Sequence, residues 1–80
     1  MPTILREKGY RFSFYSYDLA ERMHVHIFKD RHECKLWLDD LTLAFNRGFK
    51  AHEIAEIRRM IAERRAEIVE RWLEDERGAN

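Results

Sequence analysis

The amino-acid sequence predicts an α+β fold, because apolar residues alternate with polar ones in the first half and recur at helical spacing in the second. Alternation within residues 3–38 predicts a four-stranded antiparallel meander with one buried face. A short helix within residues 39–48 and a long C-terminal amphipathic helix over residues 51–76 should follow, with residues 77–80 as a tail. Because the chain has 80 residues, these elements form a single domain, close to the smallest size that one apolar core stabilises unaided.

The strands are separated by segments with turn or loop character. We expect the four strands at residues 2–8, 10–16, 23–28 and 34–38. Gly9 should take the positive φ angle of a tight hairpin turn between the first two strands. Residues 17–22 lack a period and should form a loop, and residues 29–32 should form the next turn.

Two helices are expected after the sheet. Asp39 or Asp40 suits the N-cap of the short helix, and Gly48 suits its C-terminal cap. The long helix has one apolar face, which carries Ile54, Ile57, Ile61, Ile68 and Trp72. A straight helix of this length would span about 39 Å, against about 20 Å for a strand. Its C-terminal part should therefore extend past the sheet and meet a partner.

Charge and cysteine content exclude some classes of protein. Lysine plus arginine and aspartate plus glutamate number 15 each, so the net charge gives no evidence of a strongly basic nucleic-acid-binding face. The single Cys34 excludes an intrachain disulfide, and alternation places it on the buried side of the sheet, where a thiol is inert. No run of 18 apolar residues and no secretory signal pattern occur, so we expect a cytoplasmic protein without a membrane partner.

Two histidines separated by one residue, His24 and His26, are the most informative feature of the chain. Strand alternation puts both imidazoles on one face. The buried face should carry Phe12, Phe14, Val25, Ile27, Leu36 and Leu38. The open face should then carry Arg11, Ser13, Tyr15, His24, His26, Lys35 and Trp37. Imidazoles titrate near neutral pH, so the pair can act as general acid and base, bind a metal, or bind an anion such as phosphate.

A metal site is the weaker interpretation of the histidine pair. Zinc requires three or four ligands, and the nearest additional candidates, His32, Glu33 and Cys34, lie beyond a turn. No established zinc-ligand spacing is present. We therefore expect no metal and no cofactor.

Purely structural roles are the alternative for the other candidate residues. Tyr15, Lys35 and Trp37 belong to residue types that are common cross-strand neighbours and can simply stabilise a sheet. Asn46 and Arg47 either end the short helix or lie at the sheet edge beside the histidines, where they would bind substrate. The histidines themselves can also be structural.

Several motifs in one order and spacing resemble a family of small prokaryotic proteins catalogued as domain of unknown function 4160. The motifs are Met1-Pro2-Thr3-Ile4-Leu5, Gly9-Tyr10-Arg11-Phe12, Tyr15-Ser16, His24-Val25-His26, Lys35-Leu36-Trp37-Leu38, Asn46-Arg47-Gly48-Phe49 and Glu53-Ile54. The family usually has proline where this chain has Met23, and a Ser-Pro step where it has Lys50-Ala51. Both departures affect the backbone and leave the candidate site groups in place. The resemblance implies a gene that lies beside that of another small protein, as in toxin–antitoxin pairs, and no assigned activity.

The leading functional hypothesis is therefore a component of a type II toxin–antitoxin-like pair that binds or cleaves RNA. His24 and His26 would be acid and base in metal-free phosphodiester cleavage, so replacing them would remove activity and leave the fold intact. Arg11 and Lys35 would bind phosphate, and Tyr15 and Trp37 would stack on bases. The alternative is a non-enzymatic interaction module, an antitoxin or adaptor, whose long helix docks on a partner. In either case we expect a cognate small protein or a second copy of the chain as partner.

Overall fold

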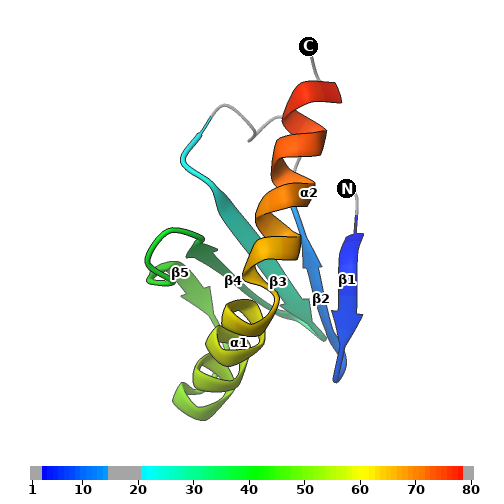
Figure 1. The fold of residues 1–80 in the computed structure, drawn as a ribbon. Helices are drawn as coiled ribbons and strands as arrows, with labels where there is room; N and C mark the ends of the chain where they lie inside the picture. Colours follow the sequence, from blue (N-terminus) through cyan, green and yellow to red (C-terminus); the bar gives the residue numbers. More distant parts are fainter. Residues whose placement is uncertain (1–2, 15–20, 79–80) are drawn as a thin grey trace.

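The protein has an antiparallel sheet of five strands with two helices packed on it (Figure 1). The computed structural model describes residues 3–14 and 21–78. The strands are β1 (Thr3–Glu7), β2 (Tyr10–Ser13), β3 (His24–Lys29), β4 (His32–Trp37) and β5 (Leu43–Arg47). The helices are α1 (Ala51–Glu63) and α2 (Arg65–Gly78). The strand order in the sheet is the order in the chain, so the α+β class and the antiparallel meander are confirmed.

The first hairpin turn has the expected backbone. Lys8 and Gly9 take φ angles of 52° and 84°, which are the positive values that a two-residue hairpin turn requires. Glu7 and Tyr10 are the pair that closes the turn. Residues 15–20, which cover part of the expected second strand and most of the expected loop, lie outside the described residues.

The short helix expected within residues 39–48 is wrong, because residues 43–47 form the edge strand β5. A turn after β4 reverses the chain: the Asp40 carboxylate accepts hydrogen bonds from the backbone N–H and the hydroxyl of Thr42, at 3.0 and 2.7 Å. Leu41, with φ of 60°, completes the turn. The aspartate assigned as a helix N-cap therefore builds a turn, and the short apolar pattern that follows fits a strand equally well.

Two arginines of the helices hold this turn in place. Arg58 donates to the Leu41 carbonyl at 2.8 Å, and Arg65 donates to the Asp39 carbonyl at 2.7 Å. The turn between β4 and β5 is therefore tied to both helices.

The single long helix expected over residues 51–76 is two helices that meet at Arg64. Arg64 has φ of −115° and ψ of 17°, outside the helical region. Its guanidinium lies 2.7 Å from the Glu7 carboxylate on β1, and Glu7 raises the pKa of Arg64. The break lets both helices lie on the same face of the twisted sheet (Figure 1). The expected tail is also shorter, because α2 extends to Gly78.

The buried face carries the six strand residues that alternation predicted. Each of them is at most 1% exposed, and Cys34 lies fully buried among them. Apolar residues of both helices complete the core. Trp72, in the C-terminal part of the helix that was expected to meet a partner, is 1% exposed and lies edge-on to Phe14 at 5.0 Å between ring centroids. The C-terminal part of the helical region therefore packs on this chain's own core.

No helix in the described part of the chain is long and apolar enough to cross a membrane.

Candidate functional site

The candidate site lies on the face of the sheet opposite the helices, which we call the outer face. The strand register places His24 opposite Trp37, His26 opposite both Ser13 and Lys35, and Arg11 opposite Phe28. The next pairs bring Phe45 opposite Lys35 and Arg47 opposite Glu33. The outer face therefore carries Arg11, Ser13, His24, His26, Phe28, Glu33, Lys35, Trp37, Phe45 and Arg47.

Two of the expected site residues are not part of this arrangement. Tyr15 lies outside the described residues. Asn46 pairs with Cys34 and so belongs to the opposite face. Its side-chain amide donates to the Phe49 carbonyl at 2.9 Å and accepts from the Phe49 N–H at 3.1 Å, which holds the link between β5 and α1.

Both imidazoles share the outer face, but the expectation that they are open to solvent is wrong. His24 is 0% exposed and His26 is 5% exposed. The His24 ring lies edge-on to the rings of His26, Trp37 and Trp72, with centroid distances of 5.2, 5.9 and 5.0 Å. Its Nδ1–H donates to the Arg22 carbonyl at 2.9 Å. Trp72 of α2 thus reaches the start of β3, and the histidine there is part of the packing.

His26 forms a pair with the Glu33 carboxylate, which strand alternation alone does not predict. The Nδ1–H of His26 donates to Glu33 Oε2 at 3.1 Å. A carboxylate only accepts, so in the neutral imidazole the basic nitrogen is Nε2. Glu33 lies diagonally across from His26, two residues before Lys35, which is the direct partner of His26. The sequence signal for this pair is the position of Glu33, which lies two residues from Lys35, the direct partner of His26 in the hairpin.

Cations lie over the aromatic rings of the outer face. Arg22 and Lys35 lie 4.6 and 4.8 Å from the centroid of the Trp37 ring. Arg47 lies 4.9 Å from the centroid of the Phe45 ring. Such cation–π contacts each contribute about 0.5–1 kcal/mol at exposed sites. The expected contact between Lys35 and the Trp37 indole is therefore present. Arg22, which alternation did not place on this face, lies against the same ring.

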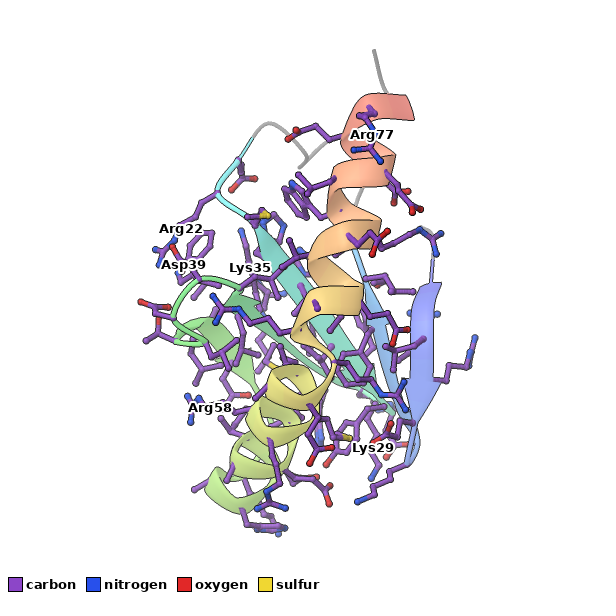
Figure 2. The ribbon with its side chains drawn as sticks, viewed as in Figure 1. Arg22, Lys29, Lys35, Asp39, Arg58 and Arg77 are labelled. Carbon is purple, nitrogen blue, oxygen red and sulfur yellow. The ribbon has the colours of Figure 1, made fainter. Side chains whose placement is uncertain are left out.

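Each of these three cations has an acidic neighbour, and that of Arg47 is Glu33 at 3.8 Å. Arg22 bonds to Asp39 at 2.6 and 2.9 Å and lies 3.3 Å from Asp40 (Figure 2). The Arg22 guanidinium holds the pKa of the Asp39 carboxyl below its usual range. Lys35 lies 3.4 Å from Glu21. The rim of the outer face near Trp37 is therefore a network of fixed charges of both signs.

Metal ligands do not gather in the described ranges. No group of three or more histidine, cysteine, aspartate or glutamate side chains suited to a metal ion occurs there. His32 lies edge-on to Phe49 at 5.4 Å. Burial raises the pKa of Cys34 to about 12, so this thiol stays protonated and is a poor ligand and nucleophile.

A family model described as "Domain of unknown function (DUF4160)" matches residues 9–73. The match includes β2 to β5, α1 and most of α2, so the chain belongs to this family. No curated protein and no solved structure matches the chain at a significant level. Function must therefore be argued from the site itself.

Proposed function

We propose that the protein binds single-stranded RNA on its outer face, as one component of a toxin–antitoxin-like pair. The observation that carries this proposal is the set of cation–ring pairs on the outer face. Both helices lie on the opposite side of the sheet (Figure 1), although Trp72 of α2 reaches His24. RNA-binding sheets commonly stack bases on aromatic and guanidinium planes while cations contact phosphates.

The accessible groups are the arginines at the rim. The side chain of Arg47 is 74% exposed and that of Arg22 is 45% exposed, whereas that of Lys35 is 14% exposed. Arg22 and Arg47 therefore make the first contacts with an RNA strand, by binding its phosphates or by stacking on its bases. Trp37, which is half-buried under Arg22, stacks on a base when the guanidinium moves aside.

RNA cleavage is a second candidate function, favoured by the pairing of His26 with Glu33. A carboxylate that orients an imidazole is the arrangement of a general base. In this proposal His26 takes a proton from the attacking hydroxyl, and His24 donates one to the leaving oxygen. Because both rings are buried, cleavage requires an opening of the outer face, and we place RNA binding first.

The interaction module remains the alternative, with a cognate small protein or a second copy as partner. The C-terminal part of the long helix, with Trp72 and Leu73, was expected to meet a partner, but Trp72 is buried in this chain's core. Leu73, at 40% exposed, is the large apolar residue that α2 still presents. A single exposed leucine is ordinary for a monomer, so the geometry favours RNA over a protein partner.

Fluorescence anisotropy with short labelled oligoribonucleotides tests RNA binding. Arg47→Gln should weaken binding about three- to tenfold and lower its dependence on salt, because one phosphate contact is lost. Trp37→Leu should weaken it by about 1–3 kcal/mol through lost stacking. Arg59→Gln, an equal loss of charge at an exposed position of α1, is the control and should have no effect. Equal affinities of Arg47→Gln, Trp37→Leu and the parent would contradict the proposal.

A further inference from the structure

A pocket of about 250 Å³ lies at the end of the sheet where two hairpin turns meet, away from Trp37. Its lining consists of Arg6, Gly9, Arg11, Phe28, Lys29 and Asp30. The turn from β1 to β2 and the turn from β3 to β4 lie together at this end (Figure 1). Figure 2 shows Lys29 beside them.

Two arginines of this pocket lie opposite each other on neighbouring strands. Arg6 of β1 and Arg11 of β2 are direct partners in the antiparallel register. Side chains of direct partners start about 4.5–5.5 Å apart, and like charges at such positions destabilise a sheet. Neither arginine forms an ion pair with a carboxylate of the described residues, in contrast to Arg22 and Arg64. Repulsion between Arg6 and Arg11 is therefore built into the pocket.

The rest of the lining fixes the geometry and adds one carboxylate. The Arg11 guanidinium lies 4.9 Å from the centroid of the Phe28 ring. The Lys29 ammonium lies 4.6 Å from the Tyr10 ring centroid. The Lys29 stem passes 3.4 Å from where a Cβ on Gly9 would stand. The Tyr10 ring belongs to the core on the helix side of the sheet, so the Lys29 ammonium lies apart from the two arginines. With Asp30 as the acidic side chain of the lining, Arg6, Arg11 and Asp30 leave one positive charge.

A phosphate monoester fits this site better than other common anions. It offers three terminal oxygens, so both planar guanidinium groups can bind it in a bidentate manner, and its negative charge offsets the repulsion between them. A phosphodiester offers only two free oxygens to the same pair of guanidinium groups. We infer that the pocket binds a phosphate monoester dianion and that, where the proposed RNA binding holds, this group is the phosphorylated end of the bound strand.

Inorganic phosphate alone tests the pocket independently of RNA. Thermal unfolding in phosphate and in chloride at equal ionic strength should show a higher Tm of the parent in phosphate, because the ligand binds only the folded state. Titration followed by amide chemical shifts should move Gly9 and Asp30. Arg6→Gln should weaken phosphate binding at least tenfold and keep or raise the Tm in chloride, since it removes the repulsion. The control Arg59→Gln should respond to phosphate like the parent.

Oligoribonucleotides that carry a terminal phosphate, or only terminal hydroxyls, identify the source of the group. A terminal phosphate should strengthen binding at least fivefold in the parent and have no effect in Arg6→Gln. If phosphate and chloride give the same Tm and no shift changes, the pocket inference is wrong. If phosphate binds but a terminal phosphate adds nothing, the assignment to an RNA end is wrong. If phosphate binds and no RNA binds, the pocket stands and the proposed RNA binding fails.

Discussion

Replacing His26 by alanine should destabilise the protein strongly, because the ring is 5% exposed. Removing a buried aromatic ring and leaving a cavity costs about 2–4 kcal/mol. The substitution also removes the hydrogen bond to Glu33, whose ion-pair partner Arg47 lies 3.8 Å away. Loss of that bond adds about 1 kcal/mol. The expected total of roughly 3–5 kcal/mol is large against the roughly 4–12 kcal/mol that a domain of this size possesses.

Asparagine at the same position separates the structural role of His26 from a catalytic one. His26→Asn keeps an N–H donor near the position of Nδ1, so the bond to Glu33 can persist and the expected loss is about 1–2 kcal/mol. Asparagine cannot act as a base. If His26 is the general base, His26→Asn remains folded and loses about 10²- to 10⁴-fold in cleavage rate. RNA binding by the rim arginines should change little.

Urea unfolding followed by circular dichroism measures the stability of both variants, and a labelled-RNA assay with added chelator measures cleavage. Chelator should have no effect on metal-free cleavage and should abolish zinc-dependent cleavage. A loss below about 1 kcal/mol for His26→Ala would refute the burial argument, which itself reverses the sequence-based expectation of an intact fold. Full cleavage activity in folded His26→Asn would exclude His26 as the base.

Three further predictions concern stability and can be checked by urea unfolding. Gly48→Ala should lower the free energy of unfolding by about 2–4 kcal/mol, because φ is 101° and the new Cβ would lie 2.4 Å from His32 Cδ2. The same substitution in a His32→Ala background should cause a smaller loss. Equal losses in the two backgrounds would contradict the steric argument. Lys50→Ser should raise stability by about 0.5–1 kcal/mol by adding an N-cap oxygen to α1, where Glu53 already accepts from the Lys50 N–H at 2.9 Å; a lower urea midpoint would count against it. Stability should fall from pH 9 towards pH 12, because Cys34 in the unfolded chain ionises near its ordinary pKa of 9.0, while the folded thiol, with a pKa of about 12, keeps its proton. This group should contribute a slope of roughly 1.4 kcal/mol per pH unit. That contribution should be absent in Cys34→Ala.

Alternation was a reliable guide to faces and a poor guide to burial. It assigned Val25 and Ile27 to the core and both histidines to the other face, because a strand has a period of two whatever covers it. It could not show that Trp72 of α2 reaches His24, since that contact depends on where β2 ends and where the helix is placed. The pairing of His26 with Glu33 depends on register, which the period alone leaves open.

The region that was expected to be helical shows which sequence signals were ambiguous. Residues 43–47 are too few for a period of two to be distinguished from a helical one, and the Asp40 carboxylate that caps helices also builds turns. The break at Arg64 has no proline or glycine to mark it, and follows from the two helices fitting one twisted sheet. Asn46 was assigned to the site on its neighbours in sequence, whereas the register puts it on the opposite face.

The strand order has a kinetic consequence. Because β1 to β5 pair only with their neighbours along the chain, no strand must wait for a distant segment before it can pair. Pairing between neighbours along the chain keeps the contacts within the sheet short in sequence, which favours fast formation of the sheet. The sheet can therefore form progressively as the chain leaves the ribosome, with the strands that carry the outer face in place before α1 and α2 emerge to cover the core.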